Sequence, residues 1–226
     1  MTERSARARK SASAAEPASE SVAALWLEVQ QRVASRAVHE VKNALNGVAV
    51  NLEVVRSRLA RAGTEVAAVA RYAYAGAAQF ETLTTLVEAL LVLSRPTSGA
   101  PDVLALLGPM VALLTAAEKP EGRGIDIAGP SVERGAAMTR ASADAVRLAL
   151  GAALLGALEA RRPVRCVVAG DGKGGTIVTI GSDGDDASPS MDARVRDAVS
   201  RDGIGVERER GAIRLTFAPP DGAFNS

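Results

Sequence analysis

The chain has almost none of the residues from which redox and metal centres are usually built. Its 226 residues include one cysteine, Cys166, and one histidine, His39. A single cysteine excludes a disulfide within the chain. Because Cys166 stands among valines, we expect a buried strand position and not a redox centre. A zinc site of the His-Glu-x-x-His type is also excluded, because position 43 is asparagine and no second histidine exists.

Aromatic residues are also few, and the net charge is close to zero. Aromatics make up 3% of the chain and the formal net charge is +1. These values argue against base-stacking platforms and against the basic surface of a general nucleic-acid binder. No run approaches the roughly 18 apolar residues that cross a bilayer, and the N-terminus lacks a signal-peptide core. We therefore expect a cytoplasmic protein with no nucleic-acid partner and no membrane insertion.

The hydrophobic content of 47% leaves room for a core and predicts two small domains. Residues 1–19 have no periodicity and are expected to form a disordered tail. The tail contains a basic cluster that is more typical of solvated disorder than of a membrane or partner contact, namely Arg4, Arg7, Arg9 and Lys10. Residues 20–97 are predicted to form a helical hairpin and residues 98–226 an α/β sandwich. The fold class is therefore α+β.

Both helices of the predicted hairpin carry an apolar seam at spacings of three and four. The first helix is expected from about Ser21 to Ala62, and its seam is Val38, Val41, Leu45, Val48, Leu52, Val55 and Leu59. The second follows Thr64 as a candidate N-cap, is stopped by Pro96, and its seam is Val66, Val69, Ala73, Gly76, Phe80, Leu83, Val87 and Leu90. One hairpin cannot bury both seams. We therefore predict a homodimer in which two hairpins form a four-helix bundle.

The single histidine lies beside the first seam, within a polar and mostly basic stripe that follows helical spacing. The stripe consists of Arg32, Arg36, His39, Lys42, Asn43 and Asn46. It suits a dianionic phosphoryl group, although a lone histidine on a helix flank is more often only a solvated side chain. Gly47 costs about 1 kcal/mol in a helix interior. We interpret it as a smooth backbone that lets a partner surface approach.

Residues 39–47, His-Glu-Val-Lys-Asn-Ala-Leu-Asn-Gly, resemble the phosphoacceptor box of sensor histidine kinases, with alanine in place of the usual proline. The segment Leu90–Arg95 is similar to the leucine-rich Ser-Arg ending of the same kinase hairpin. The resemblance implies that His39 takes the phosphoryl group, that Glu40 acts as general base, and that Asn43 helps to orient water for dephosphorylation.

The rest of the chain has the alternating pattern of an α/β sandwich, and its order resembles the ATP-binding domain of the same kinases. We expect helices from Asp102 to Glu118 (with Pro109 as a candidate kink), from Ser142 to Leu158 and from Met191 to Ser200. We expect strands at Gly124–Ala128, Ala136–Thr139, Val164–Ala169, Thr176–Gly181, Ile204–Glu209 and Ala212–Ala218. The glycine-rich segment 170–175 is interpreted as a hairpin turn, because it lacks the Gly-Lys-Ser/Thr ending of a phosphate-binding loop.

The nucleotide motifs of that kinase domain are missing. In its Asn-Leu-Leu-x-Asn-Ala-x-Glu-Ala box, the asparagines help to hold magnesium and phosphates. Residues 152–160 align with this box, but Ala152 and Gly156 replace the asparagines and cannot supply oxygen ligands. Ser182 replaces an adenine-binding aspartate, and the added carboxylates of residues 183–186 would repel phosphates. No Gly-x-Gly-Leu-Gly lid is present. We therefore expect no ATP and no cofactor, with magnesium only on a receiver partner.

Together these features predict a histidine phosphotransferase without autokinase activity, which relays phosphoryl groups between response-regulator aspartates. His39 is the phosphocarrier, Glu40 its base, and Asn43 steers water or the receiver. Arg36, Lys42 and Asn46 are the predicted phosphoryl or partner contacts. The expected partners are receiver domains and a sensor kinase. Two alternatives stay open, a receiver phosphatase acting at the same residues and a non-catalytic scaffold that binds a kinase or receiver.

Overall fold

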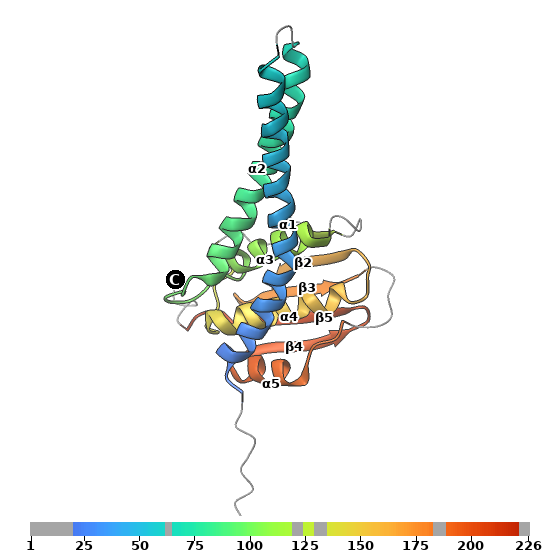
Figure 1. Cartoon of the computed structure of the whole chain (residues 1–226). Helices are drawn as coiled ribbons and strands as arrows, with labels where there is room; N and C mark the ends of the chain where they lie inside the picture. The colour runs from blue at the N-terminus through green and yellow to red at the C-terminus, as the bar shows by residue number, and fades with distance from the viewer. Residues whose placement is uncertain (1–19, 62–64, 119–123, 129–134, 183–188, 222–226) are drawn as a thin grey trace, which may run out of the picture.

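The chain folds as a long antiparallel helical hairpin followed by an α/β sandwich, an α+β arrangement (Figure 1). The computed structural model describes residues 20–61, 65–118, 124–128, 135–182 and 189–221. Helix α1 spans Val22–Leu59 and α2 spans Val66–Ser94. Figure 1 shows the far part of the hairpin projecting away from the sheet. The predicted tail and the Thr64 cap lie outside the described residues.

The sandwich contains three helices and a five-stranded sheet in the described part of the chain. Its helices are α3 (Val103–Glu118), α4 (Ala143–Leu158) and α5 (Ala193–Arg201). Its strands are β1 (Ile125–Ala128), β2 (Val164–Gly170), β3 (Thr176–Gly181), β4 (Ile204–Glu209) and β5 (Ala212–Phe217). The strand order is β1-β2-β3-β5-β4, in which β1 pairs parallel with β2 and the other pairs are antiparallel.

Side-chain caps set the predicted helix starts. The Ser21 side chain accepts a hydrogen bond from the Ala24 amide, and the Ser142 side chain accepts one from the Ala145 amide. Asp102 does the same at the start of α3, where its Oδ1 accepts from the amides of residues 104 and 105. Such caps satisfy amides that have no partner inside the helix. Pro109 lies inside α3, which continues past it to Glu118.

The predicted β2–β3 and β4–β5 hairpins are confirmed, and one predicted strand is wrong. In the first hairpin, Asp171 Oδ1 accepts hydrogen bonds from the Lys173 and Gly175 amides, which makes a tight turn. The segment Ala136–Thr139 forms only an isolated bridge between Met138 and Asp102. The segment that contains Asp102 continues directly into α3 at Val103. No strand is therefore available there to extend the pairing with Met138.

One hydrophobic core joins the start of the hairpin to the sandwich. The first turns of α1 contribute buried residues to it: Leu25, Trp26, Val29, Val33 and Ala37. They pack on α4 and α3, and α4 is buried on nearly all sides, with the sheet on its other face. The boundary predicted between residues 97 and 98 stays a prediction, because this core extends across it.

The predicted seams are only half covered in one chain. On α1, Val41, Val48 and Val55 are half-buried against α2, whereas alternate members of the seam point to solvent. Those exposed members are Val38, Leu45, Leu52 and Leu59. The predicted seam of α2 is half covered in the same way: Val69, Gly76, Leu83 and Leu90 are half-buried, whereas Val66, Phe80 and Val87 are exposed. The fully buried residues of α2, which are Leu86, Ala89 and Leu93, were not part of that seam. These three lie where α2 packs between α1 and α3, a contact that helical spacing alone does not reveal.

Helix α2 departs from the expectation that no segment could span a bilayer. By length and composition alone it qualifies as a candidate span, although one such helix is weak evidence because the core helix of a soluble protein passes the same test. Only 17% of its apolar window is buried within the chain. Most of the apolar surface of α2 is therefore exposed within a single chain.

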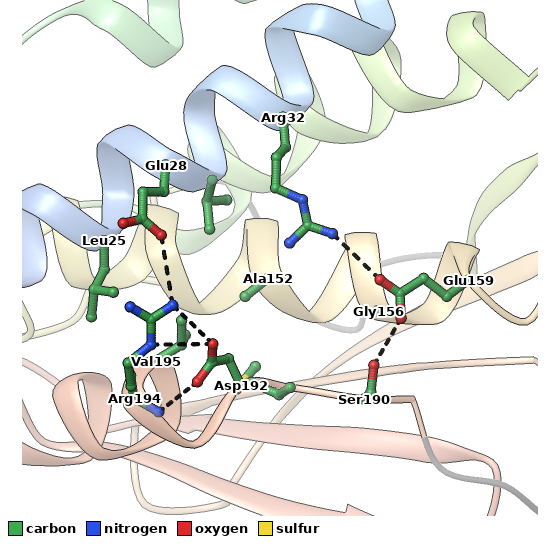
Figure 2. A pocket seen from close by; sticks show the side chains of 12 residues that line it. Leu25, Glu28, Arg32, Ala152, Gly156, Glu159, Ser190, Asp192, Arg194 and Val195 are labelled. Carbon is green, nitrogen blue, oxygen red and sulfur yellow. Dashed lines mark hydrogen bonds and ion pairs between the residues drawn. The ribbon is translucent and has the colours of Figure 1, made fainter.

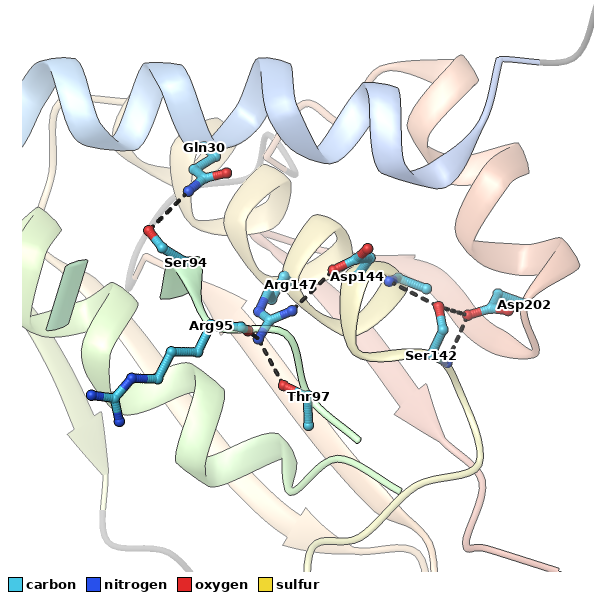
Figure 3. A network of polar contacts seen from close by, with 9 residues as sticks. Gln30, Ser94, Arg95, Thr97, Ser142, Asp144, Arg147 and Asp202 are labelled. Atoms are coloured by element: carbon cyan, nitrogen blue, oxygen red, sulfur yellow. Dashed lines mark hydrogen bonds and ion pairs between the residues drawn. The ribbon is translucent and has the colours of Figure 1, made fainter. Parts of the chain in front are cut away.

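Arg147 of α4 holds the segment that leaves α2. Its NH2 group donates to the Arg95 carbonyl at 2.6 Å and to Thr97 Oγ1 at 2.7 Å, and its NH1 group pairs with Asp144 at 2.9 Å (Figure 3). The Arg147 side chain is 3% exposed. Buried charges of this kind persist only with such partners, so the end of α2 is attached firmly to the sandwich.

Arg147→Ala should lower the free energy of unfolding by about 2–4 kcal/mol, because it removes the donor to the Arg95 carbonyl and to Thr97 and opens a cavity where a buried side chain was. Arg56→Ala is the matched control. Arg56 pairs with Glu53 on the exposed surface of α1, and its loss should cost less than about 0.5 kcal/mol. Urea unfolding followed by circular dichroism measures both. Equal losses of unfolding free energy in the two variants would show that Arg147 does not hold the end of α2.

Candidate functional site

His39 is exposed on α1, just beyond the turns that pack on the sandwich. The neighbouring Glu40 is half-buried and Asn43 is exposed. The Asn43 Nδ2 group donates a hydrogen bond to Glu40 Oε1 at 3.1 Å. The helix therefore presents an accessible imidazole beside a carboxylate and amide that are already held together. The three residues predicted to act together lie within one turn.

The basic stripe is partly engaged in contacts with the sandwich. Arg36 NH1 lies 3.1 Å from Glu118 Oε1 at the end of α3, and Arg32 NH2 lies 3.3 Å from Glu159 Oε1 just after α4. Arg36 was predicted to contact a phosphoryl group, but here a carboxylate already balances its charge. Lys42 and Asn46 are exposed as expected. Sequence reasoning did not find Glu118 or Glu159, because pairs 82 and 127 residues apart leave no local pattern.

The interpretation of Gly47 as a partner contact is wrong within this structure. A Cβ placed on Gly47 would lie 3.0 Å from Gln79 Cγ on α2. The carbonyl of Gly47 also accepts a hydrogen bond from Asn51 Nδ2 at 2.8 Å. The missing side chain therefore makes room for Gln79 of the same hairpin.

A mixed polar and apolar pocket of about 340 Å³ lies between α1, α4 and the start of α5 (Figure 2). Ala152 and Gly156 line it, and these are the positions where the kinase box has asparagines. Glu159 sits at one end, where it accepts hydrogen bonds from Arg32 and from Ser190 Oγ at 2.9 Å. Two positions that align with the asparagines of the kinase box thus line a cavity in this structure.

The charged groups of this pocket neutralise each other. Arg194 NH1 lies 2.9 Å from Glu20 Oε2, and Arg194 also pairs with Asp192 and, at 3.8 Å, with Glu28. Hydrogen bonds from Arg194 lower the pKa of Asp192 below its usual value. Every arginine that lines the pocket thus already faces a carboxylate. A triphosphate would have to displace these carboxylates before it gained any cation.

Close helix packing narrows the space further. A Cβ on Gly151 of α4 would lie 2.7 Å from Val29 Cγ1 and 3.5 Å from Trp26, both on α1. A Cβ on Gly156 would collide with the carbonyl oxygen of Ser190. No asparagine can therefore occupy position 156 unless the Ser190 backbone moves. The carboxylates predicted at residues 183–186 lie outside the described residues.

The other candidate chemistry of the chain is inert. Cys166 is fully buried on β2, and burial, followed by the charge of Asp126, raises the pKa of its thiol to about 12. The thiolate that a redox or nucleophilic role requires is therefore not formed near neutral pH. Within the described ranges, no group of three or more His, Cys, Asp or Glu residues could hold a metal ion.

No protein-family model matches the sequence, and no curated protein is similar enough to it to count as a relative. Among solved structures, a bacterial phosphotransferase at 1.7 Å is 14% identical, with a TM-score of 0.35 over 84% of this chain and 95% of that chain. The histidine kinase domain of the blue-light activated kinase EL346 of Erythrobacter litoralis is 16% identical, with a TM-score of 0.37 over 83% and 94%. The Acinetobacter baumannii histidine kinase AdeS is 12% identical, with a TM-score of 0.37 over 81% and 98%. Similarity at this level supports no functional conclusion.

Two helical glycines of the site region should respond in opposite directions to alanine. Gly156→Ala should destabilise the protein by about 2 kcal/mol or more, because the new methyl group meets a fixed backbone carbonyl. Gly47→Ala meets only the exposed side chain of Gln79, which can shift by a few tenths of an ångström, and should be neutral or stabilising by up to about 1 kcal/mol. Chemical denaturation of both variants measures the change in unfolding free energy and tests these two expectations. A stabilising Gly156→Ala would show that Ser190 does not close this side of the pocket.

Proposed function

We propose that this chain is a histidine phosphotransferase of two-component signalling, which relays phosphoryl groups between response-regulator aspartates through His39. The observation that carries the proposal is the exposed His39 imidazole beside the Glu40–Asn43 hydrogen bond, on a helix face that a globular partner can reach. A merely solvated histidine would not require an ordered acid–amide pair in the same turn. The kinase-like box of residues 39–47 supports the same reaction.

In the proposed step, the unprotonated ring nitrogen of His39 attacks the phosphorus of an aspartyl phosphate on a docked receiver. A P–N bond forms while the P–O bond to the aspartyl carboxyl breaks, and the carboxylate leaves with the bonding electrons. The other ring nitrogen releases its proton to Glu40 or to water. Exposed Lys42 offsets the negative charge that gathers at the site. The reverse reaction passes the phosphoryl group to a second receiver.

The proposal assigns no ATP-dependent step to this chain. Three features support that assignment: Gly156 packs on a backbone carbonyl, the pocket arginines already face carboxylates, and α1 packs directly on α4 at Gly151. Each of them would have to change before a nucleotide could enter beside Ala152. The phosphoryl group must then come from another phosphorylated protein.

Asn43 favours a second candidate, hydrolysis of a receiver phosphate at the same place. Its Nδ2 is held by Glu40, which leaves its exposed amide oxygen to accept a hydrogen bond from water. Water oriented in this way would attack the receiver's phosphorus and release inorganic phosphate without a phosphohistidine. Transfer and hydrolysis therefore differ in whether label ever resides on His39.

Incubation with a panel of receiver domains labelled at their aspartates should transfer acid-labile label to wild type. His39→Ala should acquire none, because its nucleophile is gone, while its binding to the same receivers should stay within about two-fold. Glu40→Ala should slow transfer, and Asn43→Ala should change mainly the release of free phosphate. Labelled ATP with magnesium is the matched donor control and should leave wild type unlabelled.

The products distinguish the three functions. Free phosphate that depends on Asn43, without label on the protein, would replace transfer by phosphatase activity. If wild type takes no label, releases no phosphate, and His39→Ala binds and signals normally, the chain is a scaffold. Labelling from ATP alone would overturn the proposed absence of an autokinase step.

We also propose that two copies pair through the projecting part of the hairpin. The exposed α1 residues Val38, Leu45, Leu52 and Leu59 recur every seven residues and are 54–68% exposed. On α2, Val66, Phe80 and Val87 follow the same register and are also exposed. Leu52 and Phe80 line an apolar groove together with Val48, Val55, Tyr72, Ala73, Gly76 and Ala77. A seven-residue apolar row is the pattern of helices that pack on one another, so a second hairpin is the occupant.

Leu52→Glu should convert the dimer to a monomer, because it places a charge in the apolar row. Val50→Glu is the control. Val50 is 63% exposed, but helical geometry places it far round α1 from Leu52, since two residues turn by about 200°. Light scattering across a concentration series should show a dimer for wild type and for Val50→Glu. A well-folded wild-type monomer at high concentration would contradict the pairing.

A further inference from the structure

We propose that the basic turn after α4, residues 159–163, is a second docking contact for the receiver domain that reaches His39. The inference rests on the proposed function, because it concerns the partner of the same site. It identifies Arg161 as a residue that determines how tightly a receiver docks, although Arg161 lies far from the phosphoacceptor in the sequence.

The direction of the helices places this turn. Helix α1 crosses α4 in such a way that Val29 meets Gly151 and, further toward the C-terminal ends of both helices, Arg32 meets Glu159. Figure 2 shows Arg32 and Glu159 together at one end of the contact. The turn that follows Glu159 is therefore at the end of the sandwich toward which α1 continues to His39.

The turn is also on the correct side of α1. Arg32 and His39 are separated by seven residues, which is nearly two helical turns, so they lie on one face about 10 Å apart along the axis. Arg161 follows Glu159 by two residues, which adds at most about 7 Å to the length of the Arg32–Glu159 ion pair. A receiver of about 100 residues has a radius of gyration near 13 Å and is therefore wider than about 26 Å. A domain of that size with its aspartate at His39 is large enough to reach the turn.

The chemistry of the turn suits such a partner. Arg161 and Arg162 are exposed, and the charge of Glu159 is already balanced by Arg32. The partner of the proposed reaction presents an aspartyl phosphate, which is anionic and therefore attracts cationic groups nearby. Cationic groups at the rim of such an interface speed association and hold the register of the complex.

The backbone at Arg161 gives an independent reason to assign it a role. Its φ is 55°, and it is the only residue other than glycine with positive φ among the described residues. Glycine is the usual residue in this conformation after a helix, because a Cβ is strained there. In the described part of the chain, no hydrogen bond or ion pair holds its side chain. Arg161 thus carries a conformational cost that no side-chain hydrogen bond or ion pair to a described residue offsets, although its backbone amide donates to the Leu158 carbonyl.

The test compares Arg161 variants in the full-length chain, with a labelled receiver that transfers to wild type. Arg161→Glu should raise the KM for the phospho-receiver by about three- to ten-fold at low salt while kcat stays within two-fold, and the difference should shrink at 0.5 M salt. Arg161→Gly should raise KM less, yet raise the melting temperature because it relieves the strained φ. That combination cannot result from unfolding. Arg161→Lys keeps the charge and should restore most of the KM.

Arg201→Glu is the matched charge reversal. Arg201 is exposed at the end of α5, which packs against the N-terminal turns of α1, far from His39. Its KM should equal that of wild type. Equal KM values for Arg161→Glu and Arg201→Glu would overturn the docking contact and leave the phosphotransferase proposal intact. Failure of every receiver to label wild type would instead remove the proposed function, and the docking contact with it.

Discussion

Close packing of α1 on α4 determines where the candidate functional residues lie. At Gly151 the two helices are so close that a single added methyl group would meet Val29. This contact brings the first turns of α1 into the core of the sandwich, and the Arg32–Glu159 and Arg36–Glu118 pairs continue it toward His39. Interiors at native density transmit such constraints rigidly. The position of His39 relative to the sandwich is therefore determined by the packing of the preceding turns of α1 on α4.

The same helix serves three purposes along its length. Its first turns are buried, its middle presents an accessible imidazole, and its far part carries an apolar row that one chain leaves exposed. The buried part stabilises the fold by removing apolar surface from water. The middle gains little from burial and is left available for chemistry. The far part has the apolar spacing of a helix bundle, which is why we propose that a second copy covers it.

The covered face of α4 explains why residues 152–160 align with the kinase box although positions 152 and 156 are not asparagine. Positions 152 and 156 still face a cavity, as the aligned box requires, but α1 and the Ser190 backbone now approach that face. Small residues at these positions allow the approach. Asparagines there would conflict with it, at least at Gly156. The Ser190 backbone and an asparagine side chain at position 156 would therefore compete for the same space.

Local sequence determined the elements of this fold where the physics is local. Ser21, Asp102 and Ser142 cap their helices with their own side chains, and the hairpins follow from alternation and turn residues. The spacing of Glu40 and Asn43 likewise predicted that they lie close together, because residues three apart share a helix face. Interactions confined to one turn need no knowledge of the rest of the chain.

The sequence by itself therefore determined the α+β order, most helix starts and the composition of the candidate site. Only the tertiary structure decided which face of each helix is buried, that Arg36 pairs with Glu118, and that Gly47 receives Gln79. The same holds for Ala136–Thr139, which lost its strand because α3 begins beside it. These outcomes depend on residues far apart along the chain. Helical or strand periodicity marks an apolar face but does not say which neighbour will cover it.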